Sequence, residues 1–223
     1  MSYSLIIPLY NEEKTLNTLL GLLKLYFDDG NEIVIIDDGS SDNSVKILKD
    51  CNFINLIQFK ENKGKGFAIR EGLKHSKHNK TIIYDSDLEL DIKDLSKLMN
   101  LDKKNKIVSI MGVRSKSFNP FRSGLDWGNF IFTTFFNFLY RSCHKDILCC
   151  AKAFYKSNIP IHKLKSKGFD IDIELSSIIT KNSIGKSIPQ VVINYTRRSI
   201  SEGKKLKISD GWSILFRVIN DFI

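Results

Sequence analysis

Features that mark several common protein classes are missing from this sequence. Only four cysteines occur among the 223 residues (Cys51, Cys143, Cys149 and Cys150), and they form no paired framework. Their number and spacing exclude a small disulfide-stapled secreted domain and indicate a reducing cytoplasm. Together with His144, the last three match the ligand spacing of no common zinc motif, so we expect no zinc site.

Long apolar runs and familiar nucleotide motifs are also missing. No uninterrupted apolar stretch approaches the roughly 20 residues that a membrane-spanning helix needs. The first residues carry no basic leader, so we expect no signal peptide. The P-loop spacing, GxxxxGK followed by serine or threonine, does not occur, which argues against a P-loop NTPase.

The composition is that of an ordinary folded protein with a basic excess. The chain is 42% hydrophobic and 26% charged, and its length suits one substantial core. The net charge of +9 suits nucleic acid, an anionic membrane or phosphorylated small molecules. Because the basic residues are spread among acidic ones and no nucleic-acid motif occurs, we expect no nucleic acid as partner.

The first half of the chain alternates apolar, strand-like segments with amphipathic, helix-like ones. We expect strands at residues 4–8, 32–36, 55–59 and 81–84, and helices at 12–27, 64–75 and 92–100. Such alternation predicts an α/β fold with a mainly parallel sheet covered on both faces. The second half is less regular, with strands expected at 106–113 and 184–195 and helices at 127–140, 171–180 and 212–223.

An acidic cluster, residues 85–91, directly follows the fourth predicted strand. Carboxylates two positions apart on an extended backbone lie on one side, so Asp85, Asp87 and Glu89 can converge on one hard cation. Three oxygen ligands suit Mg²⁺ or Mn²⁺, which takes further ligands from a substrate phosphate. The alternative is a solvated acidic turn that caps the next helix, a role we assign to Asp91.

Three other turns follow predicted strands and lie at the same edge of a parallel sheet, where ligands bind. After the first strand, Tyr10 can lie against a flat ring and Glu12 can accept hydrogen bonds from a base or ribose. After the second, Asp38 can do the same, beside a glycine that permits a tight turn. After the third, residues 62–66 place glycines and lysines at a helix start, which suits an anion. Each turn is equally compatible with simple helix capping.

Taken in order, these segments resemble glycosyltransferase family 2, and most closely its polyprenyl-phosphate branch, which is dolichol-phosphate mannose synthase-like. The resemblance is carried by the motifs PLYNEE, DDGSSD, NKGKGFAIREG and DSDLE. Later counterparts lie at residues 111–114, 146–154, 168–174 and 198–205. The chain departs from the family pattern at Ser86, Val113 and Ala151, where alanine, serine and tyrosine are usual.

The resemblance implies the GT-A fold, a three-layer α/β/α sandwich around a mainly parallel mixed sheet. It implies one glycosyltransferase domain over 1–223, in which 1–115 bind the nucleotide sugar and 116–223 form the acceptor half. Asp85, Asp87 and Arg114 are implied as catalytic. Mg²⁺ or Mn²⁺ is implied on Asp85, Asp87 and Glu89. The implied donor-binding residues are Pro8, Tyr10, Glu12, Asp38, Lys65, Asp85, Ser86, Asp87, Arg114, Arg198 and Lys204.

The expected activity is metal-dependent, inverting transfer from a GDP- or UDP-sugar to a polyprenyl or dolichyl phosphate. A divalent ion and fixed cationic side chains stabilise a leaving diphosphate. A phosphate acceptor is already ionised, whereas a hydroxyl acceptor needs a general base, and no catalytic histidine is evident. Two alternatives are transfer to a sugar hydroxyl in polysaccharide or lipid-linked glycan assembly, and an inactive nucleotide-sugar-binding membrane module.

The aromatic segment 127–140 is typical of a membrane contact. It is too short and too polar to span, but it resembles an interfacial helix bordered by Arg122 and Arg141. The alternative is a core helix packed on the sheet. Because a basic protein is attracted to anionic headgroups, we expect a peripheral protein on the cytoplasmic face of a membrane.

Overall fold

A seven-stranded mixed sheet forms the centre of the computed structural model, which describes residues 2–115, 124–183, 188–198 and 210–222. The strands are β1 (Ser4–Leu9), β2 (Glu32–Asp37), β3 (Asn55–Gln58), β4 (Lys80–Ile83), β5 (Ser109–Arg114), β6 (Lys152–Tyr155) and β7 (Gln190–Ile193). Their spatial order is β3-β2-β1-β4-β6-β5-β7. Strand β6 runs antiparallel to both of its neighbours, whereas every other pair is parallel. The predicted mainly parallel sheet is confirmed.

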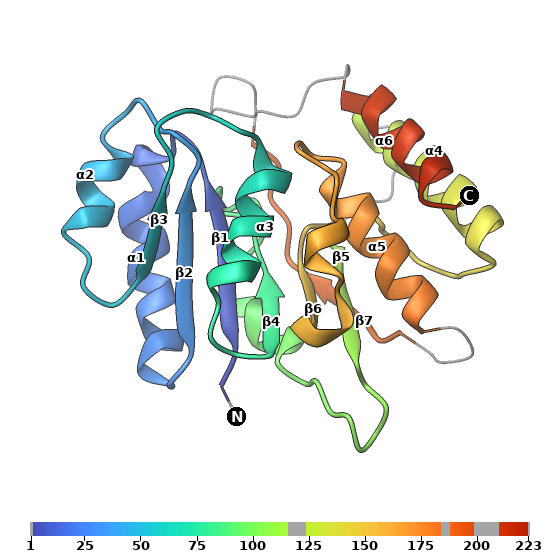
Figure 1. Ribbon diagram of the computed structural model, residues 1–223, viewed down its shortest axis with the longest axis horizontal. Helices are drawn as coiled ribbons and strands as arrows, with labels where there is room; N and C mark the ends of the chain where they lie inside the picture. Colours follow the sequence, from blue (N-terminus) through green and yellow to red (C-terminus); the bar gives the residue numbers. More distant parts are fainter. Residues whose placement is uncertain (1, 116–123, 184–187, 199–209, 223) are drawn as a thin grey trace.

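Helices cover both faces of the sheet (Figure 1). The α-helices are α1 (Glu13–Asp28), α2 (Ser44–Lys49), α3 (Lys65–His75), α4 (Gly124–Tyr140), α5 (Ile171–Asn182) and α6 (Asp210–Asn220). Short 3₁₀ helices are η1 (Ile92–Leu98), η2 (Lys156–Asn158) and η3 (Ile161–Lys163). Helices α1 and α2 pack with η1 on one face, and α3 and α5 on the other, so the predicted three-layer arrangement is also confirmed.

The alternation of side chains along β1 explains why its sequence is apolar after Ser4. Leu5 and Ile7 point to the cluster beneath α1, whereas Ile6 points to the cluster beneath α3. Because both faces of a parallel strand are covered, each position must be apolar. Helix α1 in turn buries one stripe, Leu16, Leu19, Leu20 and Leu23, whose spacing follows the helical repeat.

Some predicted boundaries differ from those of the structure. The fifth strand begins at Ser109, later than predicted, because Asp102 and Ile107 pair across a turn in which Lys106 has a φ of 60°. The seventh begins at Gln190, and residues 184–187 lie outside the described part of the chain. The segment after the acidic cluster is a 3₁₀ helix. The carboxylate of Asp91 accepts the Lys93 N–H at its start, so the predicted capping role of Asp91 is confirmed.

Helices α4 and α6 lie together against α5 at one end of the molecule (Figure 1). Phe136 is fully buried in their shared core, where Tyr140 stacks on it with 4.1 Å between ring centroids. The opposite sides of these two helices expose large apolar side chains to solvent: Trp127, Phe130, Ile131, Phe138, Trp212, Phe216 and Ile219. No helix in the described ranges is both long and apolar enough to cross a membrane.

Candidate functional site

The loops that follow β1 and β2 are joined to each other at the carboxyl edge of the sheet. The backbone N–H of Asn11 donates to the Ser40 hydroxyl, and the N–H of Ser41 donates back to the Asn11 side chain, each at 2.8 Å. Tyr10 lies in this joined loop and is partly exposed, while Pro8 is buried within β1. The first two turns predicted from the sequence therefore form one structural unit.

Asp38 connects that unit to the start of α3. Its two carboxylate oxygens accept the backbone N–H groups of Lys63 and Gly64, each at 2.8 Å. Burial raises the pKa of Asp38, and these two donors oppose the shift. Gly64 has a φ of 96°, and a Cβ there would lie 2.3 Å from the carbonyl oxygen of Lys167, so glycine is required. Each oxygen of Asp38 keeps a second lone pair that can accept from a ligand.

The acidic cluster lies in a tight turn beyond the end of β4, and its backbone is not extended as predicted. Leu88 has a φ of 58°, and the N–H of Glu89 donates to the Asp87 carboxylate at 3.0 Å. Burial raises the pKa of Asp87 to about 6, with the negative charges of Asp85 and Glu89 adding to the shift. Ser86 is buried between the two aspartates. The turn therefore concentrates mutually repelling carboxylates.

A divalent cation fits two of these carboxylates. In the part of the chain that the structure describes, no three His, Cys, Asp or Glu side chains are grouped to hold a metal ion. Asp85 and Asp87 nevertheless supply the hard oxygen donors that Mg²⁺ prefers, and that ion is commonly held by one or two carboxylates plus substrate phosphates. Burial and the neighbouring carboxylates Asp85 and Glu89 together raise the Asp87 pKa, and such an ion would neutralise the negative charge that they disfavour.

Lys65, the first residue of α3, is shared between two carboxylates. Its ammonium lies 2.8 and 3.0 Å from the two oxygens of Asp85 and 3.1 Å from Asp172 at the start of α5. Burial alone would lower the Lys65 pKa, but Asp172 and Asp85 outweigh it and raise that pKa well above its ordinary value. For Asp85 burial acts in the opposite direction and would raise the pKa, but the charge of Lys65 holds that pKa below the usual range.

Arg198 holds the acidic turn against the first loop. Its guanidinium donates to both carboxylate oxygens of Glu12, at 2.9 and 3.0 Å, and lies 3.6 Å from Asp87. Its backbone N–H donates to the Glu89 carboxylate at 2.9 Å. The structure thus brings Glu12, Asp87 and Glu89 around one arginine. Lys204, the other predicted residue of this basic segment, lies outside the described residues.

Arg114, at the end of β5, forms a bidentate pair with Asp146. Its Nε and Nη2 lie 2.7 and 2.8 Å from the two carboxylate oxygens, and Asn129 of α4 also donates to Asp146. The Arg114 guanidinium lies 5.5 Å from the ring centroid of Tyr195. This arginine therefore joins β5 to the loop before β6, a positioning role that the sequence did not suggest.

Sequence reasoning also missed Asp172 and Lys152 as parts of this site. The Lys152 ammonium is fully buried, donates to the backbone carbonyls of Ile147 and Cys149, and lies 3.8 Å from Asp172. Asp170, Asp172 and Glu174 lie in a segment that resembles the family in sequence, but the resemblance gives Asp172 no contact with Lys65. Only the structure shows that one of them, Asp172, reaches Lys65, because α3 and α5 share one hydrophobic cluster on the same face of the sheet.

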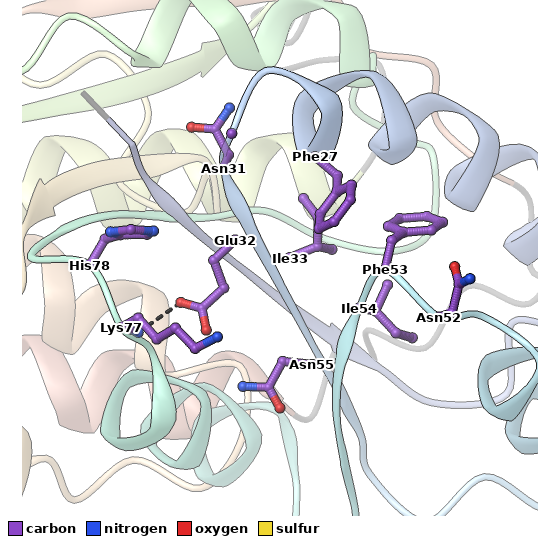
Figure 2. Close-up of a pocket in the computed structure, with 11 residues that line it drawn as sticks. Phe27, Asn31, Glu32, Ile33, Asn52, Phe53, Ile54, Asn55, Lys77 and His78 are labelled. Atoms are coloured by element: carbon purple, nitrogen blue, oxygen red, sulfur yellow. Dashed lines mark hydrogen bonds between the residues drawn. The ribbon is translucent and has the colours of Figure 1, made fainter.

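A pocket of about 350 Å³ lies at the opposite edge of the sheet, where β2 and β3 begin (Figure 2). Phe27 and Phe53 form one wall, and Glu32 accepts the backbone N–H of Lys77 at 2.7 Å. Because ligands of open α/β sheets bind at the carboxyl ends of the strands, we assign the functional site to the edge that carries the acidic turn.

Comparisons with known proteins agree with this architecture. The model of glycosyl transferase family 2 matches residues 4–159. The chain is 26% identical to a dolichyl-phosphate beta-glucosyltransferase of Dictyostelium discoideum, over 99% of this chain and 72% of that protein. It is 27% identical to the UDP-N-acetylglucosamine–dolichyl-phosphate N-acetylglucosaminyltransferase of Methanococcus voltae, over 96% and 94%.

The fold is similar to that of a solved glycosyltransferase structure. Glucosyl-3-phosphoglycerate synthase of Mycobacterium tuberculosis, crystallised with Mn²⁺, UDP and phosphoglyceric acid, superposes with a TM-score of 0.74. The match covers 99% of this chain and 78% of that one at 15% identity. At such identity the likeness concerns the fold alone, and it confirms the predicted GT-A architecture.

Proposed function

Because the chain belongs to glycosyltransferase family 2, we propose that it transfers a sugar from a nucleotide diphosphate sugar to a polyprenyl or dolichyl phosphate. Two relatives that align with nearly the whole chain are dolichyl-phosphate glycosyltransferases, which supports a lipid phosphate as acceptor. One of them uses a UDP-sugar by name, and the similar solved structure contains UDP. We therefore place UDP-sugars before GDP-sugars as donors.

The observation that carries the proposal is the meeting of the acidic turn with Lys65 and Arg198 at the carboxyl edge of the sheet. A nucleoside diphosphate leaves with more negative charge than it carries in the sugar donor. Fixed positive groups aimed at that charge lower the barrier, because they need no reorganisation during the reaction. Arg198, held by Glu12, can supply such a fixed group, and Lys65 adds a second positive charge beside the turn.

We assign Mg²⁺ or Mn²⁺ to Asp85 and Asp87, with Glu89 as a further candidate ligand. Bound there, the ion supplies positive charge to the leaving diphosphate oxygens. Tyr10, Glu12 and Asp38 are assigned to the nucleoside, since they surround the joined loops after β1 and β2. The assignment also agrees with the Mn²⁺ in the similar solved structure.

The phosphate side of the site is assigned to Arg114, Arg198 and Lys204. Buried pairing holds the guanidinium groups of Arg114 and Arg198 in fixed orientations. The acceptor phosphate is ionised at neutral pH, so one of its oxygens can bond to the anomeric carbon without a general base. The bond to the leaving diphosphate breaks at the same carbon, and attack from the opposite side inverts its configuration.

The exposed apolar sides of α4 and α6 fit a lipid-linked acceptor. Two neighbouring helices that present large aromatic side chains to solvent are typical of interfacial membrane contact. We propose that the protein lies on the cytoplasmic face of a membrane through these helices. The acceptor headgroup can then reach the site while its chain stays in the bilayer.

The test is sugar transfer from radiolabelled UDP- and GDP-sugars to short-chain polyprenyl phosphate or to glycan acceptors, with and without EDTA. We expect a lipid-phosphate product whose formation EDTA abolishes and Mn²⁺ restores, with an inverted anomeric centre by NMR. Product on glycan hydroxyls alone would favour the polysaccharide alternative. Donor binding with neither transfer nor hydrolysis would favour the inactive module.

A further inference from the structure

The ammonium of Lys65 occupies the same carboxylate that we assign to the divalent ion. It contacts both oxygens of Asp85, at 2.8 and 3.0 Å, and its third contact is Asp172 at 3.1 Å. The side chain of Lys65 is only 11% exposed, so water does little to screen these charges. A cation that binds Asp85 must therefore displace Lys65 from this carboxylate or share the carboxylate with it.

Asp172 can accept a further hydrogen bond from Lys65. Its Oδ1 atom is buried and has no hydrogen-bond partner among the described residues, although the nearby Lys152 ammonium lies 3.8 Å away. Lys152 directs its donors to the carbonyls of Ile147 and Cys149 instead. A buried carboxylate oxygen without a donor is unfavourable. A small movement of the Lys65 ammonium away from Asp85 would give that oxygen the donor it lacks.

A divalent ion at Asp85 would change which carboxylate Lys65 prefers. Lys65 and Lys152 carry two positive charges, and Asp85 and Asp172 carry two negative ones. When a divalent ion takes Asp85, the ammonium of Lys65 is repelled by that ion and attracted by Asp172. The two carboxylates are thus alternative partners of one lysine, on two elements that already lie together.

We propose that Lys65 is a built-in counter-cation that exchanges with the divalent ion. It holds the Asp85 carboxylate ionised and in place while the metal is absent, and it pairs with Asp172 once the metal binds. Asp172 is a positioning residue in this scheme, because it sets how readily Lys65 releases Asp85. The inference rests on the proposed function, since it takes Asp85 as a metal ligand.

The test measures binding of Mn²⁺ alone at pH 8, by electron paramagnetic resonance of the free ion. Lys65→Met removes the competitor, so we expect at least about fivefold tighter binding, a coupling typical of linked sites. Asp172→Asn leaves Lys65 wholly to Asp85, so we expect binding weaker by about the same factor. Lys63→Met removes an equal charge from the same loop without contact to Asp85, and we expect a change below about twofold.

A double-variant cycle separates exchange from simple long-range attraction. In the Lys65→Met background, Asp172→Asn should change Mn²⁺ affinity by less than about twofold, because the residue acts through the lysine. Additive effects of the two substitutions would overturn the exchange, as would weaker binding in both single variants. If Lys65→Met shows no cooperative unfolding transition and is therefore not folded, Lys65→Gln is measured instead, with the same expected gain in Mn²⁺ affinity. Absence of Mn²⁺ binding to the wild type, with or without UDP, would instead overturn the metal assignment of the proposed function and the exchange with it.

Discussion

Arg198 and Glu12 form a bidentate ion pair that spans 186 positions of the sequence, with N–O distances of 2.9 and 3.0 Å. The pair lies at the point where the first loop, the acidic turn and the segment after β7 meet. Arg198 also lies 3.6 Å from Asp87 and donates its backbone N–H to Glu89. One arginine therefore contacts three carboxylates, Glu12 and Asp87 through its guanidinium and Glu89 through its backbone N–H.

Arg198→Lys should reduce transfer strongly while leaving the protein folded. A lysine keeps the positive charge but cannot reproduce the planar, two-pronged contact with Glu12. We expect kcat/KM for the nucleotide sugar to fall by about 10- to 100-fold, less than the roughly 100- to 1000-fold seen when a charge-stabilising donor is removed outright, because the charge is kept. The assay is initial-rate transfer, with thermal unfolding followed in parallel.

Arg197→Lys is the matched control for that substitution. Arg197 is the residue before Arg198, and it makes a similar bidentate pair with Asp126 of α4. We expect its kcat/KM to stay within about threefold of the wild type. Equal losses in the two variants would mean that the pair with Glu12 has no special part in the reaction.

Neutralising Asp87 should separate activity from stability. Asn in its place still accepts the Glu89 N–H but removes a carboxylate that Asp85 and Glu89 repel. We therefore expect Asp87→Asn to unfold at the same or a higher temperature at pH 7, while metal-stimulated transfer falls by at least about 100-fold. Asp91→Asn removes a charge from the same turn and keeps a capping side chain, so it should retain activity. Full activity in Asp87→Asn would remove that residue from the metal site.

The succession of β1 to β4 along the chain could be predicted because each strand carries a short apolar run and helix-like segments separate the strands. These are local signals, and the parallel sheet follows from them. The antiparallel strand β6 lies between β4 and β5, and its position depends on pairing across the sheet. Local periodicity carries no information about that pairing, so the arrangement of the strands in the second half of the chain could not be predicted.

The site shows the same limit at the level of single residues. Asp85 and Asp87 stand out in the sequence because three carboxylates recur at alternate positions after an apolar run. Asp172 lies 107 positions from Lys65, and only the tertiary fold, which places α3 and α5 over the same hydrophobic cluster, brings the two together. The turn at Leu88 was also hidden, because a φ of 58° is unusual for leucine and is imposed by its surroundings.

His144 should make the protein less stable in weak acid. Burial, aided by the positive charge of Lys152, lowers the pKa of His144 from 6.5 to about 4. The unfolded chain therefore binds more protons than the folded one between these values, and the free energy of unfolding rises with pH across that window and levels off above it. The contribution lost on acidification is on the order of 3 kcal/mol.

Urea unfolding of His144→Gln between pH 4 and pH 8 tests this assignment. Glutamine can still hydrogen-bond to the Thr180 hydroxyl, which lies 2.8 Å from the Nε2 of His144. We expect the difference in unfolding free energy between the variant and the wild type to change through the window from pH 6.5 down to pH 4, and to be constant above it. A constant difference over the whole range would show that His144 does not titrate as proposed.

The outer side of α4 and α6 should bind anionic lipid vesicles. Phe138 and Trp212 are 79% and 68% exposed, so replacing them with serine removes little buried area and should not lower the unfolding temperature. Burying one such ring is worth roughly 1.5–3 kcal/mol, so the double variant should lose at least about 100-fold in vesicle affinity. The measurement is flotation with phosphatidylcholine vesicles that contain phosphatidylglycerol. Leu25→Ser, at a residue of α1 that is 63% exposed, is the matched control and should float like the wild type. Equal flotation of all three proteins would exclude these helices as the membrane contact.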